Sequence, residues 1–117
     1  MYHAGIHSIA KDSIGRIWFS GYDAVYRYDG NSFERFEEQI SSMLPQDYWN
    51  FGQLATDGQG QLYLSSNHGL LVFDYVSGKF DSVISGNIGS LVSSGDGSIW
   101  FVKTGRVYRK NLQDLED

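Results

Sequence analysis

The chain repeats one pattern three times, and this repeat limits the possible folds more than any other feature. The three copies begin at residues 6, 51 and 88 and read IHSIAKDSIGRIWFS, FGQLATDGQGQLYLS and IGSLVSSGDGSIWFV. Gly15, Gly60 and Gly97 fall in register between the copies. Repeats of about 20–50 residues are the signature of stacked structural units. We therefore expect several equivalent units inside one domain.

Strand-like segments follow each copy at matching positions. The segments AVYRYD, GLLVFD and RVYRKN begin at residues 24, 69 and 106, and a further segment follows twice, as SFERF from residue 32 and KFDSV from residue 79. Four strands in about 40–45 residues are typical of one β-propeller blade. The predicted fold is therefore all-β, with about three four-stranded antiparallel blades that form an incomplete propeller.

The same pattern predicts where each blade begins and ends. We expect blade one at about 6–36, a link at 37–50, blade two at about 51–83 and blade three at about 88–117. Blade three lacks a clear outer strand, because NLQDLED is a poor strand sequence. The link at 37–50 is much longer than the ISGN that joins blades two and three. We expect almost no helix in the chain beyond one short turn in this link.

The first two strands of each unit are joined by DSIG, DGQG and SGDG. The side chains of Asp12, Asp57 and Ser94 can accept a hydrogen bond from the backbone N–H two residues on, and the final glycine can adopt a positive φ. A phosphate loop would need G-x-x-x-x-G-K, and a calcium loop would need a twelve-residue pattern ending in Glu. Neither pattern occurs, so these segments are predicted to be plain turns.

Both faces of the second strand in each unit are largely apolar. Ile17 and Phe19 alternate with Trp18 in the first copy, and the other copies keep this alternation. A sheet with one solvent-exposed face would carry polar residues at alternate positions, whereas a blade between two others is covered on both faces. A large aromatic residue recurs at one position, as Trp18, Tyr63 and Trp100. We therefore expect Trp18 and Trp100 to be buried between blades.

The charge and composition exclude several classes of protein. The net charge is −5 and the nine Lys and Arg residues form no run, so a nucleic-acid partner and direct contact with an anionic membrane are not expected. The absence of Cys excludes disulfides and thiolate chemistry. No apolar run approaches the roughly 20 residues of a membrane span. The start MYHAGIHS has neither the basic nor the apolar region of a signal peptide.

The repeat is similar to that of a known family. The pattern I-x-x-I-x-x-D-x-x-G-x-I-W-F, followed by V-x-R-Y-D and F-x-x-F, resembles the two-component regulator propeller repeat. The resemblance covers nearly the whole chain. It is carried most closely by eight residues of blade one: Ile9, Asp12, Gly15, Ile17, Trp18, Val25, Tyr28 and Asp29. Blade three departs more from the pattern, because Ser94 replaces the Asp and no F-x-x-F follows.

The resemblance implies a sensor. Such repeats build the extracellular sensor region of bacterial hybrid two-component systems, found especially in Bacteroidetes, ahead of a β-sandwich, a membrane helix and a histidine kinase. The cues of these sensors are often oligosaccharides. The resemblance therefore implies that this chain is a periplasmic fragment of a sensor propeller in a histidine kinase, and that the chain itself is not an enzyme.

Two other functions stay open. One is a structural or protein-interaction scaffold without its own ligand, and the other is a propeller lyase or glycosidase. A glycosidase needs two carboxylates facing each other across a cleft, and no local pattern indicates such a pair. His3 and His7 are four residues apart, which is roughly 13 Å along a strand and too far to share a metal ion easily. No metal or cofactor is expected.

The candidate ligand site lies on the face opposite the D-x-x-G turns. Antiparallel alternation places the link at 37–50 on the same face as the turns at 21–23 and 66–68. Loops on a rigid scaffold commonly carry function, although these loops can equally be ordinary surface. The candidate ligand-binding residues are Tyr22, Asp23, Tyr48, Trp49, Asn67 and His68.

The number of blades predicts a further partner. Propellers close with roughly 4–8 blades, and the sequence encodes about three. Both ends of the stack would expose apolar blade faces, which recruit other chains. We expect these faces to be covered by the remaining blades of the same propeller or by another copy of the chain.

Overall fold

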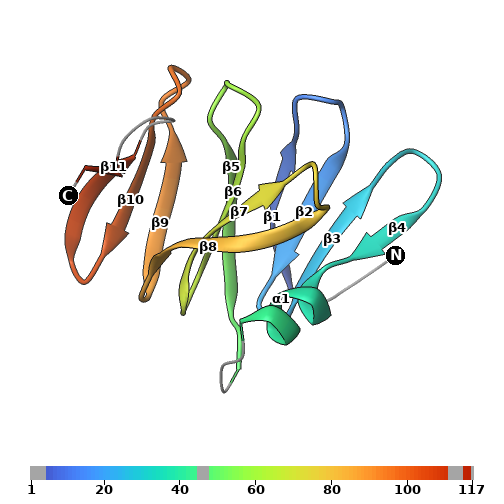
Figure 1. The fold of residues 1–117 in the computed structure, drawn as a ribbon, viewed down its shortest axis with the longest axis horizontal. Helices are drawn as coiled ribbons and strands as arrows, with labels where there is room; N and C mark the ends of the chain where they lie inside the picture. Colours follow the sequence, from blue (N-terminus) through green and yellow to red (C-terminus); the bar gives the residue numbers. More distant parts are fainter. Residues whose placement is uncertain (1–4, 45–47, 111–114, 117) are drawn as a thin grey trace.

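The structure is a computed structural model of the chain, and it describes residues 5–44, 48–110 and 115–116. Within these residues the chain forms three four-stranded antiparallel sheets, and consecutive strands are neighbours in each sheet (Figure 1). The all-β fold with propeller-like blades is therefore confirmed. The strands of the first sheet, blade one, are β1 (Ile6–Lys11), β2 (Ile17–Gly21), β3 (Ala24–Tyr28) and β4 (Phe33–Arg35).

The other two blades repeat this order. Blade two contains β5 (Phe51–Thr56), β6 (Leu62–Ser66), β7 (Gly69–Asp74) and β8 (Lys79–Ser85). Blade three contains β9 (Ile88–Ser93), β10 (Ile99–Lys103), β11 (Arg106–Lys110) and β12 (Leu115–Glu116). The first strand of blade two, β5, contacts both β1 and β9, so the three first strands lie side by side.

The D-x-x-G turns lie together at one end of the blades, at the top of Figure 1. Asp12 Oδ1 accepts a hydrogen bond from Ile14 N–H at 3.2 Å, and Asp57 Oδ1 accepts one from Gln59 N–H at 2.7 Å. These are the bonds that the sequence predicted. In blade three the accepting side chain is that of Asp96, two residues after Ser94, and it accepts a bond from Ser98 N–H at 3.1 Å.

The interface between blades one and two forms the larger part of the core. Trp18 is fully buried there, with its ring centroid 5.1 Å from that of Phe36, 4.9 Å from Phe73 and 5.6 Å from Phe80. The Arg27 guanidinium lies 5.4 Å from the Trp18 ring centroid. The prediction that Trp18 is buried between blades is therefore confirmed.

A second cluster joins blades two and three. Tyr63 occupies the position of Trp18 in the repeat, and it packs with Leu70, Ile88, Ile99 and Phe101. The recurring aromatic position therefore faces the following blade in both interfaces. This direction explains why the environment of Trp100, at the same position of the third copy, is different.

Trp100 was predicted to be buried, and this prediction is wrong. Its side chain is 38% exposed, whereas those of Trp18 and Tyr63 are 0% and 2% exposed. Trp100 lies on the outer face of blade three, where no described residues form a following blade to cover it. Val92 and Val107 on the same face are also exposed. A shallow hollow of about 160 Å³ runs between these side chains.

The link and the last strand also differ from expectation. The link forms a seven-residue helix, α1 (Glu37–Met43), rather than a single turn. Ile40 of α1 is fully buried, and the Gln39 side chain pairs with both backbone groups of Phe80 in β8, at 2.9 and 3.1 Å. These contacts with distant residues hold the helix, whose place in the link was predicted but whose length was not. Blade three does have a fourth strand, because β12 pairs with β11 over two residues.

Candidate functional site

Each first strand carries an irregularity near its start. The pairing register shifts between Ile6 and Ser8 in β1 and between Phe51 and Leu54 in β5. In blade three the shift falls between Phe101 and Lys103 of β10, which pair with Leu91 and Ile88 of β9. β-Bulges of this kind redirect side chains and occur next to functional sites. The three bulges occupy one position of the repeat, opposite the D-x-x-G turns.

The bulged segments also link neighbouring blades through hydrogen bonds. Ser8 Oγ accepts a bond from Leu54 N–H at 3.0 Å, which joins blade one to blade two. Gln53 Oε1, at the position of Ser8 in the repeat, accepts a bond from Leu91 N–H at 2.8 Å, which joins blade two to blade three. Ser20 Oγ donates a further bond to Gly52 O at 2.7 Å. The bulged end of the blades is therefore a connected framework.

A groove of about 610 Å³ opens over these bulges. All three blades contribute to its walls, since its lining includes residues of β1, β5 and β9 and of the turns beside them. The side chains that give it its chemical character are His7, Tyr22, Tyr48, Asn50, Gln53, Asn67, Asn87 and Ser90. This volume lies in the range of about 300–1,000 Å³ that is usual for small-molecule sites.

Two exposed tyrosines line this groove, and a histidine ring packs against each at a steep angle. The Tyr22 and Tyr48 side chains are both 64% exposed. The ring centroids of His7 and Tyr22 are 5.2 Å apart with an interplanar angle of 67°, and those of His68 and Tyr48 are 6.3 Å apart at 71°. Edge-to-face contacts of this kind orient aromatic rings, so the histidines hold both tyrosines at the groove.

Asn67 and His68 hold the end of the link in place. His68 Nε2 donates to Tyr48 O at 2.6 Å, and Asn67 Nδ2 donates to the same oxygen at 3.3 Å. Asn67 Oδ1 accepts a bond from Asn50 N–H at 2.9 Å. The backbone is tied further by a bond from Phe51 N–H to Tyr22 O at 2.9 Å. These bonds position Tyr48, so Asn67 and His68 have a supporting role.

The remaining two sequence candidates lie apart from the groove lining. Trp49 is 8% exposed and belongs to the core cluster, where its ring stacks on Phe51 with centroids 5.8 Å apart. Its ring faces are therefore not available to a ligand. Asp23 is exposed next to Tyr22 but does not line the groove. Of the six candidates, the structure brings Tyr22, Tyr48 and Asn67 to the groove.

Sequence reasoning missed several groove residues, namely His7, Asn50, Gln53, Asn87 and Ser90. Most of them lie in first strands, where an alternating pattern assigns side chains to blade faces rather than to the end of the sheet. The aligned triplets IHS, FGQ and IGS at the start of each copy were the available signal. These triplets differ between the copies, whereas the positions that follow them in the strand keep their apolar residues.

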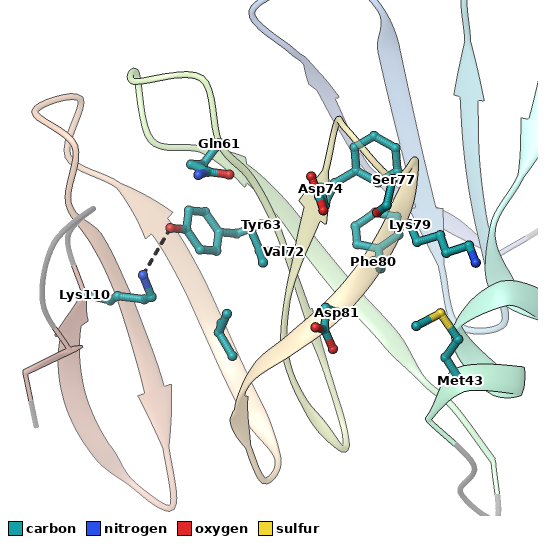
Figure 2. A pocket seen from close by; sticks show the side chains of 12 residues that line it. Met43, Gln61, Tyr63, Val72, Asp74, Ser77, Lys79, Phe80, Asp81 and Lys110 are labelled. Carbon is teal, nitrogen blue, oxygen red and sulfur yellow. Dashed lines mark hydrogen bonds between the residues drawn. The ribbon is translucent and has the colours of Figure 1, made fainter.

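A second pocket of about 610 Å³ lies on the outer side of blade two (Figure 2). Lys110 Nζ lies 3.4 Å from Tyr63 Oη, and burial together with the charge of Asp57 raises the pKa of Tyr63 to about 12. Figure 2 shows Lys79 and Lys110 at opposite ends of this pocket, so their charges do not converge on one ligand atom. The pocket therefore has less of the character of a binding site than the groove.

Two features are absent from the described part of the chain, a cluster of metal ligands and a helix able to span a membrane. Among residues 5–44, 48–110 and 115–116, no three His, Asp or Glu side chains gather as a metal site would require. His3, one of the histidines considered above, lies outside these residues. In the same ranges no helix has the length and apolar character needed to cross a membrane.

Two solved structures are similar to this chain along nearly its whole length. One is the extracellular domain of BT3049 from B. thetaiotaomicron, a protein assigned as a hybrid two component system. The TM-score is 0.74 and the sequence identity is 18%, and the match covers 96% of this chain and 18% of that chain. The other is the extracellular domain of BT4673 from the same organism, assigned as a one component system; the TM-score is 0.71 at 14% identity, over 95% of this chain and 17% of that one.

Comparison of sequences adds no further relative. No family model matches the chain, and no curated protein matches it. This chain spans less than a fifth of the length of the two similar structures. The fold expected from the repeat is thus shared with parts of the extracellular domains of these two proteins.

Proposed function

We propose that this chain is part of the extracytoplasmic, ligand-sensing propeller of a bacterial two-component histidine kinase, and that its cue is an oligosaccharide. The observation that carries the proposal is the groove over the three bulges, on a fold shared with extracellular domains of signalling systems. The resemblance of the repeat supports the same assignment and a periplasmic location for the module. The kinase would lie in other parts of the parent protein.

The position of the groove suits a sensor. Its walls come from three successive blades, so one ligand would contact all three at once. The blades are already joined there by the bonds from Leu54 and Leu91 N–H to Ser8 and Gln53. A ligand that contacts all three blades favours one arrangement of the blades over others, and such differential binding is what shifts a conformational equilibrium.

The groove favours binding over catalysis. A glycosidase requires an opposed pair of carboxylates, and none of the described residues that line the groove is Asp or Glu. A lyase or glycosidase is therefore the weaker candidate for this site.

A scaffold without its own ligand is the second candidate, and one observation favours it. The outer face of blade three presents Trp100, Val92 and Val107 to solvent, all of them exposed. Exposed apolar patches mark surfaces that contact other proteins. A scaffold would use this face and leave the groove empty.

The test is a binding screen with the folded 117-residue chain. Soluble oligosaccharides from plant and microbial polysaccharides would be tested by glycan array and by thermal shift. A sensor binds at least one of them saturably and its unfolding temperature rises with ligand concentration, because ligand that binds only the folded state stabilises it. If the folded chain bound none of them, the proposal of oligosaccharide sensing would fail and the scaffold would be favoured.

A further inference from the structure

We infer that the groove over the bulges takes an uncharged oligosaccharide, and that Tyr22 and Tyr48 are the platforms on which its sugar rings stack. This inference rests on the proposed function and narrows it to one class of glycan. It concerns glycans without carboxylate or sulfate groups, as opposed to uronic-acid or sulfated glycans.

The lining of the groove has the chemistry of a neutral polyol site. Amides and a hydroxyl are supplied by Asn50, Gln53, Asn87 and Ser90. Amide side chains carry both donors and acceptors, and a hydroxyl does the same. Sugar hydroxyls also donate and accept, so this set matches them without the need for a charge. None of the described lining residues is Asp, Glu, Lys or Arg.

The chain would also disfavour a polyanion. Recognition of carboxylate, sulfate or phosphate groups generally uses Arg or Lys, which pair with these groups directly. The described lining contains neither, and the net charge of −5 adds a repulsive field at long range. The anionic groups of a uronic-acid or sulfated glycan would lose hydration without gaining a charged partner. The free-energy cost of this desolvation would exceed the gain from the new contacts.

The two tyrosines supply the apolar part of the site. Each side chain is 64% exposed, and each ring is contacted by a histidine, His7 for Tyr22 and His68 for Tyr48. The apolar C–H face of a sugar ring packs on an aromatic face, while the tyrosine hydroxyl remains available for a hydrogen bond. Because the backbone around both residues is tied by hydrogen bonds, little ordering is required when a ligand binds.

The bulges of all three blades lie along the groove. A Cβ atom at Gly52 would lie 2.4 Å from Ser65 Oγ, so a larger residue here would displace the hydroxyl that accepts a bond from Gln53 N–H. Bulges leave backbone groups outside the regular ladder of the sheet, and the three bulges place residues of β1, β5 and β9 along one groove. The groove therefore spans three blades, which suits a chain of sugars better than a single one.

The experiment compares uncharged and anionic probes on the folded 117-residue chain. The uncharged probes are oligosaccharides from starch, xylan and mannan, and the anionic probes are oligogalacturonate and heparin fragments. Calorimetric titration at 50 and 500 mM NaCl gives the affinity of each. We expect an uncharged probe to bind with the same affinity at both salt concentrations. Tyr22→Ala and Tyr48→Ala should each weaken binding by about tenfold, whereas the Ile14→Ala control, on the opposite face, should not.

The outcomes separate the inference from the proposed function. Binding of anionic probes alone, with a strong loss of affinity at 500 mM NaCl, would overturn the inference and leave oligosaccharide sensing intact. Binding of an uncharged probe that Tyr22→Ala and Tyr48→Ala leave unchanged would also overturn it, because the site would lie elsewhere. If the folded chain bound neither class of probe, the proposed function itself would fail.

Discussion

The hydroxyl of Tyr75 donates a hydrogen bond to Asp12 Oδ2 at 2.9 Å, across 63 positions of the sequence. The same oxygen accepts a bond from Trp18 Nε1 at 2.9 Å. Asp12 therefore ties the first turn of blade one to its own buried Trp and to blade two.

The stability of the chain should depend on ionised Asp12. Burial alone would raise the pKa of this carboxyl, but hydrogen bonds from Trp18, Arg16, Tyr75 and Ile14 outweigh it and hold the pKa below 3.8. Because the folded-state pKa is the lower one, the stabilisation is present above pH 3.8 and is lost as the pH falls through the folded-state value. Asp12→Asn should cost about 1–3 kcal/mol at pH 7.

The pH dependence of urea unfolding tests this prediction. The difference in unfolding free energy between the wild type and Asp12→Asn should shrink as the pH falls below 3.8 toward 2. Asp29 and Asp96, whose pKa values are also lowered, titrate in both proteins and so cancel in the comparison. A difference that stayed constant from pH 7 to pH 2 would show that the charge of Asp12 contributes nothing.

The two tryptophans of the repeat should respond differently to truncation. Trp18→Ala should lower the free energy of unfolding by about 3–5 kcal/mol, as for other large core side chains, since Trp18 is fully buried. Trp100→Ala is the matched control and should cost much less, because 38% of Trp100 is already exposed. Urea midpoints for the two variants check this, and equal losses would mean that a further element covers Trp100.

The bond between Ser8 and Leu54 should hold blades one and two together. Ser8→Ala leaves Leu54 N–H without the acceptor it has at 3.0 Å, which should cost about 1–2 kcal/mol. Ser13→Ala, in a D-x-x-G turn, is the control. Amide hydrogen exchange at Leu54 is the direct readout. Unchanged protection of this amide would indicate that another group replaces the serine.

The open blade faces predict self-association of the 117-residue chain when no further blades cover them. Blade one presents Ile9 and Phe33 outward, and blade three presents Trp100 and Val107, all exposed. The outer faces of blades one and three correspond to the two faces that meet between neighbouring blades inside the chain. Blade three of one copy would therefore stack on blade one of the next. Light scattering should show oligomers that Trp100→Glu disrupts. A monomeric wild type at high concentration would contradict this expectation.

Much of the fold follows from the sequence, because each strand repeats the same local pattern. Alternation placed Trp18 and Tyr63 on the faces that the structure buries, and the D-x-x-G turns formed with the predicted bonds. The burial of Trp100 could not be predicted in this way, since burial depends on whether another blade lies beside it. The helix α1 is held by Gln39 and by the core, which are contacts with distant residues.

The candidate site was less predictable than the fold. Topology placed Tyr22, Tyr48 and Asn67 at one end of the blades, and the structure brings them to one groove. Local sequence did not distinguish the exposed Tyr48 from its buried neighbour Trp49, because both are aromatic residues in a link. The bulges that bring Gln53 and Ser90 into the groove arise from pairing between strands, and an alternating pattern does not reveal them.

The most direct test of the groove is a map of amide chemical shifts in the ¹⁵N-labelled chain, titrated with the uncharged oligosaccharide that binds most tightly. We expect the largest changes at the amides of His7, Gln53 and Ser90, one from each blade, with little change at Gly15, Gly60 and Gly97 in the opposite turns. Changes concentrated at those three glycines, with the bulge amides unaffected, would contradict the placement of the ligand site.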